Sequence, residues 1–412
     1  MSDITAPSWT ALSTAPTTPF RARVARAIIH NAVNRFPVRV TFPDGTVWGG
    51  GDTSAPELKI VRPDSLFRRL GAHSKIGLGE AYMAGDWTTG DDTDLADLLT
   101  PFAARLTSIV PKPLQRLRGF VDERLPHHER NTSEGARSNI ERHYDLSNDL
   151  FAQFLDPSLS YSSAWFESPE ESLESAQLRK IDGILDQAAV TVGSRVLEIG
   201  SGWGSLAIRA AERGATVTTI TLSQEQAALA QERFEAAGVT DRIEIRLQDY
   251  REVPQSETGS YDAIVSVEMI EAVGEEFWPT YFQTIDRLLA PGGRVSIQAI
   301  TMADHRYRAT RNSYGWIQKY IFPGGLIPSP LAIDRHLAEH TGLRVAATRS
   351  LGPDYARTLH LWREEFNRNW HDINALGFDA TFRRMWEFYL GYCEAGFRTG
   401  YLDVLQLQMR RR

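Results

Sequence analysis

A glycine-rich turn between an apolar strand and a helix is the feature that most constrains this fold. Residues 194–200 (SRVLEIG) are typical of a buried strand, glycines follow at alternate positions, and residues 205–214 (SLAIRAAERG) are typical of a helix. Beyond them we expect strands at 216–222, 242–249, 261–270 and 292–300, alternating with helices at 223–238 and 277–290. Such units build a parallel sheet with helices on both faces, and ligands bind at the carboxyl ends of its strands. The sequence therefore predicts an α/β, doubly wound, mostly parallel sheet.

Two ligand classes compete for the glycine turn. The dinucleotide fingerprint is G-x-G-x-x-G, and counted from Gly200 its last position is Ser205, so the match fails. The spacing G-x-G-x-G after Glu198 instead resembles class I S-adenosylmethionine methyltransferases, in which the glycines pass under the amino acid part of the cofactor. Further along, Gln226 can bond a ribose diol, and Asp249 can accept a bond from the adenine amino group. The alternative role for Asp249 is a helix or turn cap.

Composition sets limits on the rest of the chain. Its 412 residues exceed one ordinary core, so we expect two domains. Cys393 is the only cysteine, which excludes an intrachain disulfide and a cysteine-based zinc site, and the net charge of −7 gives no reason to expect nucleic acid. The N-terminus lacks a signal-peptide pattern and no run of 18 apolar residues occurs, so we expect a cytoplasmic protein whose membrane contact is peripheral.

Basic segments gather in the N-terminal part of this acidic chain. Residues 20–36 predict an amphipathic helix with four arginines and no acid, and a second basic cluster lies between 105 and 130. Two interpretations stay open for this helix: it packs on its own domain, or it lies on anionic lipid at the inner face of the plasma membrane. The intervening pattern predicts a hairpin at 38–48, a strand at 58–63 and a mostly helical stretch at 64–125.

The pattern places the domain boundaries near one polar, turn-rich stretch. That stretch, residues 131–139, is the expected linker. A smaller N-terminal α+β domain, which docks on lipid, is expected at 1–130, and the catalytic domain at 140–412.

Several separate stretches, in order, resemble the cyclopropane-fatty-acyl-phospholipid synthase family, which includes the mycolic acid methyltransferases. They are HYDLSNDLF (143–151), LSYSSAWF (159–166), VLEIGSGWGSL (196–206), TLSQEQ (221–226), QDYR (248–251), VEMIEAVG (267–274), IQKYIFPGGLIPS (317–329) and GPDYARTLHLW (352–362). The stretches VEMIEAVG, SIQAITM (296–302), WIQKYIFPGG and GFRTGYLDV (396–404) also look like the actinobacterial branch that methylates oleoyl phospholipids at carbon 10. The resemblance implies a Rossmann-like class I methyltransferase fold.

The resemblance also implies the reaction. The family transfers a methyl group from S-adenosylmethionine to a carbon of a cis double bond in an acyl chain, which leaves a carbocation that must lose a proton; no metal is needed. We expect a 10-methylene-stearoyl chain, which a partner flavin-dependent reductase then saturates on the way to tuberculostearic acid. The alternative product is a cyclopropane, and the alternative of another class is a non-catalytic lipid-binding protein on the same fold. A homodimer is a candidate assembly.

The cofactor-binding residues expected from the turn and the resemblance lie in five parts of the catalytic domain. They are Tyr144, beside His143 in the segment that covers the cofactor, Tyr161, Ser162, Glu198, Gly200, Gly202, Gly204, Thr221, Leu222, Gln226, Gln248 and Asp249.

The expected catalytic group surrounds one anion. Glu271 falls at the family's active-site glutamate, which helps to bind a bicarbonate ion thought to take the proton. Tyr355 matches a tyrosine at the same anion, and Ile300 matches a residue that contributes its backbone. Bicarbonate is therefore a candidate second ligand beside S-adenosylmethionine.

The chain departs from the family pattern around this anion. Ser163 stands where cysteine is usual, Ala272 and Gln298 stand where histidines are usual, and Glu268 stands where glycine is common. Ser163 and Gln298 can still hydrogen-bond an anion, but an added carboxylate would repel it. Glu268 is therefore a second candidate proton acceptor; a structural role is the alternative.

Overall fold

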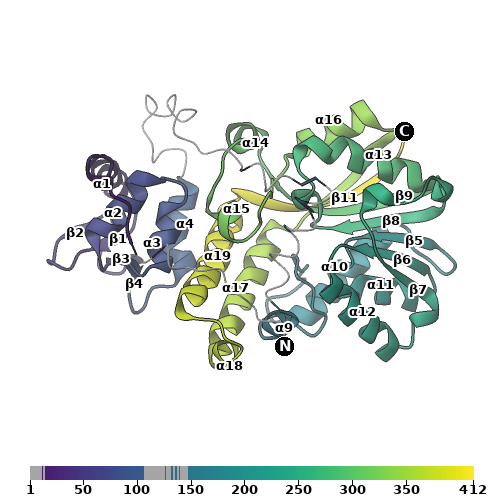
Figure 1. Cartoon of the computed structure of the whole chain (residues 1–412), viewed down its shortest axis with the longest axis horizontal. Coiled ribbons are helices and arrows are strands. Elements are labelled where there is room, and N and C mark those ends of the chain that lie inside the picture. The colour runs from purple at the N-terminus through teal and green to yellow at the C-terminus, as the bar shows by residue number, and fades with distance from the viewer. Residues whose placement is uncertain are drawn as a thin grey trace. The chain divides into compact units, whose positions relative to one another are not determined.

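The computed structural model describes residues 12, 14–105, 126, 131, 132, 135, 136, 139 and 147–412. By their contacts these residues form two compact units (Figure 1). The first unit joins the described part of Met1–Arg124 to Ser313–Ile321 and Phe366–Thr399, and the second comprises the described part of Leu125–Asn312 together with Phe322–Glu365 and Gly400–Arg412.

The first unit contains a small four-stranded sheet in the order β2-β1-β3-β4. The predicted hairpin is present, because β1 (Arg39–Thr41) pairs antiparallel with β2 (Val47–Trp48). The strand β3 (Glu57–Ile60) runs parallel to β1 and antiparallel to β4 (Trp87–Thr89). The strand β4 lies within the stretch expected to be mostly helical, since three residues are too few to show an alternating pattern.

Helices from three parts of the chain complete the first unit. They are α1 (Pro19–Val33), α2 (Pro63–Ala72), α3 (Gly77–Met83), α4 (Leu95–Ala104), α15 (Trp316–Tyr320), α18 (Trp370–Ala375) and α19 (Ala380–Arg398). Hydrogen bonds tie the late segments to the early ones: Tyr82 donates to Glu387 over 2.9 Å, and Lys319 donates to Glu80 over 2.6 Å. Local sequence patterns do not indicate such long-range pairs. For this reason the expected catalytic domain, 140–412, included residues 313–321 and 366–399, which the contacts group with the first unit.

The second unit is built on a seven-stranded sheet in the order β10-β11-β9-β8-β5-β6-β7. Neighbours from β9 to β7 are parallel, whereas β11 runs antiparallel to both β9 and β10. This confirms the predicted mostly parallel, doubly wound sheet. The strands are β5 (Arg195–Ile199), β6 (Thr216–Thr221), β7 (Ile243–Leu247), β8 (Tyr261–Val267), β9 (Leu289–Met302), β10 (Leu343–Ser350) and β11 (Leu402–Arg411).

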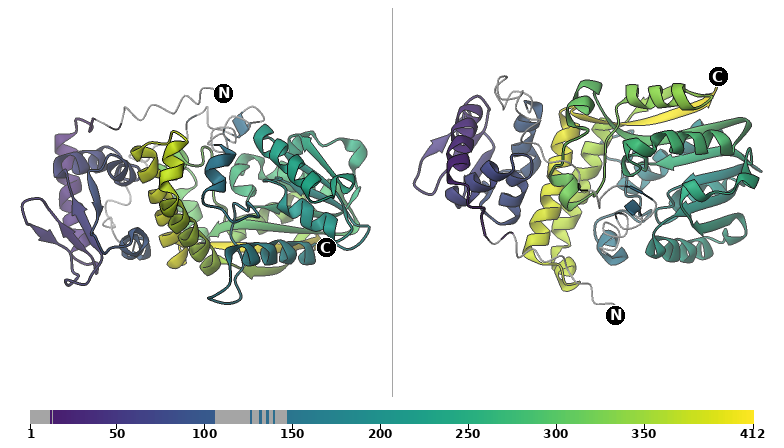
Figure 2. Two further views of the ribbon diagram at one scale, coloured as in Figure 1. Left: turned by 90° about the horizontal axis from the view of Figure 1, so that it is seen from below. Right: turned by 45° about the horizontal axis from the view of Figure 1, so that its top comes forward.

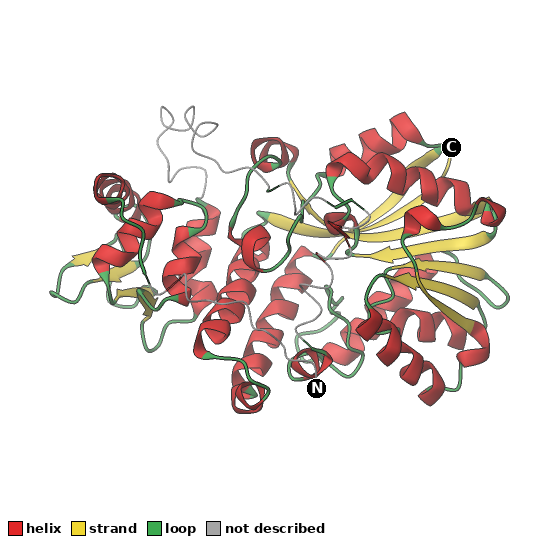
Figure 3. Cartoon of the chain, viewed as in Figure 1, coloured by secondary structure: helices red, strands yellow, loops and turns green. Residues whose placement is uncertain are grey.

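Helices lie on both faces of this sheet (Figures 1, 2 and 3). Alternate residues of its central strands point to two cores: Val196 and Val265 pack in one, and Leu197 and Ile264 in the other. The first core includes α10 (Leu173–Gln187), α11 (Ser205–Glu212) and α12 (Gln224–Ala236), and the second includes α13 (Trp278–Leu288) and α16 (Pro330–His340). The remaining helices are α9 (Asn148–Ala152), α14 (Asp304–Thr310) and α17 (Gly352–Arg368), whose last residues enter the first unit.

The strand order reverses between β5 and β8. From β5 the chain moves outward through β6 and β7, and then returns to β8 on the other side of β5. Ligands bind outside the carboxyl ends of the strands at such a switch point. The glycine turn after Ile199 and the segment after Val267 therefore flank the expected site. None of the helices in the described ranges combines the length and apolar character needed to span a bilayer.

Candidate active site

The three glycines of the turn after β5 have two different steric roles. All three have positive φ: 95° at Gly200, 48° at Gly202 and 89° at Gly204. A Cβ on Gly200 would lie 2.6 Å from Met269 Cγ, and one on Gly204 would lie 2.5 Å from Phe234 Cε1, whereas one on Gly202 would meet nothing within 4 Å. The outer two glycines thus permit close packing, and the middle one leaves the space over the turn open for a ligand.

The strand that leads into this turn carries a buried acid. Glu198 accepts a hydrogen bond from Thr219 Oγ1 over 2.6 Å and faces the charge of Lys180. Burial raises the pKa of Glu198 to about 8, against the opposing effects of those two neighbours. This side chain lies in the interior of the domain.

The carboxyl end of β6 brings together three expected cofactor residues. Thr221 ends the strand, Leu222 follows it, and Ser223 caps α12 by accepting from the Gln226 backbone N–H over 3.1 Å. The Thr221 hydroxyl donates to the Gln226 side-chain oxygen over 3.3 Å. This bond engages the Gln226 side-chain oxygen and fixes the orientation of its amide.

The next strand end adds Gln248 and Asp249. The Gln248 backbone N–H donates to the Thr221 carbonyl over 2.9 Å, which links the ends of β6 and β7. Asp249 caps a short 3₁₀ helix, and both its oxygens accept from the Arg251 guanidinium, over 2.9 and 2.6 Å. Asp249 thus acts as a cap, and its two-point ion pair with Arg251 fixes the Asp249 carboxylate in one orientation.

Glu268 lies where β8 ends, and three donors surround its carboxylate. It accepts from the Ser163 backbone N–H over 2.9 Å, from Gln298 Nε2 over 2.8 Å and from the Tyr355 hydroxyl. The Ser163 hydroxyl is turned away and donates to the Ala164 carbonyl over 3.0 Å. Ser163 therefore serves this carboxylate through its backbone and not through its side chain.

The Gln298 amide is held in one orientation from the neighbouring strand. Gln406 lies opposite Gln298 in the β11–β9 ladder, and its Nε2 donates to Gln298 Oε1 over 3.1 Å. The Gln298 Nε2 then has both hydrogens engaged, one by Glu268 and one by the Ser163 carbonyl over 3.2 Å. Gln406 therefore orients the Gln298 amide so that its N–H group, and not its oxygen, faces the Glu268 carboxylate.

Glu271 lies in the short 3₁₀ helix Ile270–Ala272, three residues after Glu268, and has fewer hydrogen-bond partners. Its Oε1 accepts from the Ile300 backbone N–H, whereas its Oε2 is buried and has no hydrogen-bond partner among the described residues. Burial, followed by the charge of Glu268, raises the pKa of Glu271 to about 8. An unsatisfied buried oxygen calls for a ligand or a proton.

Lys180 supplies the positive charge of the site, and the sequence analysis missed it. This buried ammonium donates to Ser162 Oγ over 2.6 Å and is attracted by Glu268, Asp156 and Glu198. Burial lowers the pKa of Lys180 to about 8 in spite of these acids. The available signal was a lysine on the buried face of α10, three residues after the equally buried Gln177. Gln406 was also missed, because one glutamine in an alternating strand carries no distinctive signal.

Aromatic rings adjoin this polar group. The Tyr161 ring lies 5.2 Å from the Trp362 ring, and the Tyr355 ring lies edge-on to Trp362 at 6.0 Å, between centroids. Two further residues expected to cover the cofactor, His143 and Tyr144, lie outside the described residues.

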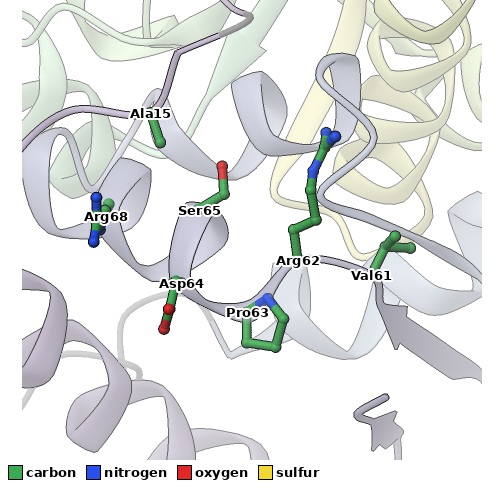
Figure 4. A pocket seen from close by; sticks show the side chains of 7 residues that line it. All are labelled: Ala15, Val61, Arg62, Pro63, Asp64, Ser65 and Arg68. Carbon is green, nitrogen blue, oxygen red and sulfur yellow. The ribbon is translucent and has the colours of Figure 1, made fainter.

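Two features of the described part of the chain bear on alternative sites. No group of three or more His, Cys, Asp or Glu side chains there is arranged to hold a metal ion. An open pocket in the first unit, at the start of α2, contains none of the expected site residues (Figure 4). Its lining is formed by Ala15, Val61, Arg62, Pro63, Asp64, Ser65 and Arg68.

A mostly parallel sheet with an antiparallel β11, an open glycine turn after its first strand and polar groups at the next strand ends define the class I methyltransferase fold and site. The model of the family "Mycolic acid cyclopropane synthetase" matches residues 131–407. The chain belongs to this family, as its motifs predicted.

Individual relatives extend the match to almost the whole chain. The tuberculostearic acid methyltransferase UfaA1 of Mycobacterium tuberculosis (strain ATCC 25618 / H37Rv) is 49% identical over 413 residues, which cover 98% of this chain and 95% of that protein. The cyclopropane-fatty-acyl-phospholipid synthase of Escherichia coli (strain K12) is 35% identical over 373 residues, which cover 87% and 89%. The crystal structure of the mycolic acid cyclopropane synthase CmaA1 complexed with SAH and CTAB matches with a TM-score of 0.61 and 31% identity, over 70% of this chain and 100% of that one.

Proposed function

We propose that this protein transfers the methyl group of S-adenosylmethionine to carbon 10 of an oleoyl chain in a phospholipid and forms a 10-methylene-stearoyl chain. The observation that carries the proposal is the pair of carboxylates, Glu268 and Glu271, on the segment whose Met269 packs against Gly200 of the glycine turn. A methyl transfer to an alkene needs a proton acceptor at this place. The named relatives support it, since one is a tuberculostearic acid methyltransferase and another binds SAH in its crystal structure.

The chemistry balances without an oxidant or a metal. When bound, S-adenosylmethionine supplies an electrophilic methyl group whose S–C bond electrons return to sulfur. The π electrons of the double bond form the new C–C bond at carbon 10, and carbon 9 becomes a cation. A hydride shift from carbon 10 to carbon 9 moves the charge to carbon 10, and loss of a methyl proton then leaves an exocyclic C=CH₂. Loss of that proton before the shift closes a cyclopropane, which is the alternative product.

The chain's own residues hold the two reactants. Over Gly202 the turn leaves space for the amino acid part of the cofactor, Gln226 faces the ribose, and Asp249 accepts from the adenine amino group. Tyr161 and Tyr355 both pack on Trp362, and we propose that these aromatic rings stabilise the carbocation electrostatically.

The acyl substrate implies contact with a membrane surface. In the first unit, α1 exposes Phe20 to 78% and Val24 to 44%, next to the exposed Arg21 and Arg23. Apolar and basic side chains together suit the interface of an anionic bilayer. We therefore place the enzyme in the cytoplasm, bound peripherally to the inner face of the plasma membrane. The methylene product becomes a methyl branch only by reduction, which implies a flavin-dependent reductase as the next enzyme.

The test is a reaction of the full chain with S-adenosylmethionine and dioleoyl phosphatidylglycerol vesicles, followed by SAH measurement and proton NMR of the fatty methyl esters. The expected result is SAH release with vinylidene protons, and distearoyl vesicles, which lack the double bond, give neither. High-field ring protons instead would establish a cyclopropane synthase. Lipid binding without SAH release would leave the non-catalytic alternative.

A further inference from the structure

The backbone at Glu268 is unusual for the residue that it carries. Its φ of 52° lies in the left-handed region, which only three other non-glycine residues of the described chain share. A residue with a β-carbon costs about 1 kcal/mol there, whereas glycine costs little. The backbone is also pinned, because the Glu268 N–H donates to the Gln298 carbonyl over 2.7 Å. A glutamate that the chain retains in this conformation points to a function of its carboxylate.

The surroundings of that carboxylate are arranged for a negative charge. Its three donors, the Ser163 N–H, Gln298 Nε2 and the Tyr355 hydroxyl, come from separate segments of the second unit. Hydrogen bonds to the charged form stabilise it, and the nearby Lys180 ammonium adds to this effect. No acidic proton needs a place in this arrangement, since each contact donates to Glu268.

Glu268 and Glu271 differ in how strongly each side chain holds a proton. Burial raises the pKa of Glu268, but its three donors and Lys180 oppose the rise. Glu271 has one backbone donor, and burial together with the Glu268 charge raises its pKa to about 8. Two coupled acids with unequal environments share one proton unequally. The proton that the pair shares is therefore favoured on Glu271, and the charge on Glu268.

Glu268 also adjoins the cofactor turn. The next residue, Met269, packs against Gly200 so closely that a Cβ on the glycine would lie 2.6 Å from Met269 Cγ. Met269 thus fixes the segment that carries Glu268 against the cofactor turn.

We infer that Glu268 is the proton acceptor of the reaction, a carboxylate that the chain itself supplies. This inference rests on the proposed function. The C–H bond of the transferred methyl group breaks, its electron pair forms the exocyclic C=C bond, and the proton goes to the Glu268 carboxylate. The resulting carboxylic acid returns its proton to water after the product leaves. A free bicarbonate ion is then not required.

The test compares E268Q and E268G with the full-length parent on dioleoyl vesicles. E268Q keeps the shape and loses the base, and E268G also vacates the space among the three donors. We expect turnover to fall at least 100-fold in both, in line with the loss of a general base, with S-adenosylmethionine affinity unchanged. Formate or bicarbonate should restore part of the activity of E268G, but not that of E268Q, and should leave the parent unaffected.

A189G is the matched control for the relief of backbone strain. Ala189 is exposed and has a φ of 55°, close to that of Glu268, and lies away from the site. Its turnover should equal that of the parent. Turnover of E268Q within threefold of the parent, or a parent that needs added bicarbonate, overturns the inference. Absence of SAH release by the parent itself would count against the proposed function instead.

Discussion

Replacement of Gly202 by alanine tests where the cofactor lies. The added methyl group meets no protein atom within 4 Å, so the change in stability comes from the backbone alone. At a φ of 48° this strain amounts to about 1 kcal/mol, or roughly 2–4 °C in melting temperature for a domain of this size. The methyl group would enter the space proposed for the amino acid part of the cofactor. We expect affinity for S-adenosylmethionine to fall at least tenfold, which is about 1.4 kcal/mol.

Gly238 provides the matched control for this change. It has a φ of 68°, and a Cβ there also meets nothing within 4 Å, but it follows the far end of α12 from the site. G238A should therefore lower the melting temperature as much as G202A and leave cofactor binding intact. Calorimetric titration with S-adenosylmethionine and SAH, together with thermal unfolding, separates the two effects. Equal affinities for G202A and G238A would refute the placement of the cofactor over the turn.

Three further changes test the supporting network. Q406L removes the donor that orients the Gln298 amide, so we expect kcat to fall about tenfold with cofactor affinity retained, and unchanged kcat would contradict this role. E198Q removes a carboxyl whose pKa is raised from 4.5 to about 8, so its stability contribution is present below pH 4.5 and lost as pH rises to 8. The melting temperature of the parent should thus decline relative to E198Q between pH 5 and 8, and parallel curves would refute the assignment. R251M frees Asp249 from its ion pair and should weaken S-adenosylmethionine binding about threefold to tenfold, as titration would show.

Local patterns were sufficient to predict the catalytic sheet. The strands β5, β6 and β8 are short runs of apolar or β-branched residues, and Ser223 marks the start of α12 by capping it. Three positive-φ glycines at alternate positions then define the turn after β5. These signals lie within a few residues of each other, so no tertiary information was needed to find them.

Contacts between distant segments were not predictable in the same way. The position of Gln406 opposite Gln298 depends on the register of β11 against β9, which are separated by more than 100 residues. Lys180 faces its acids only because α10 packs on the sheet. The departures at Ser163 and Gln298 were visible in the sequence, but not that the first acts through its backbone.

The departures from the family pattern at Ser163, Gln298 and Glu268 form one hydrogen-bonded group in the structure. A carboxylate at residue 268 needs donors that cannot lose their protons, and a backbone N–H and an amide meet that need at any pH. A histidine at position 298 would gain and lose charge near neutral pH, and would bind the carboxylate differently in each state. Gln298, held by Gln406, removes that dependence, while Lys180 balances the added charge. The roles of Glu268, Gln298 and Lys180 therefore depend on one another. Changing any one of them alone should impair turnover more than changing a surrounding apolar residue.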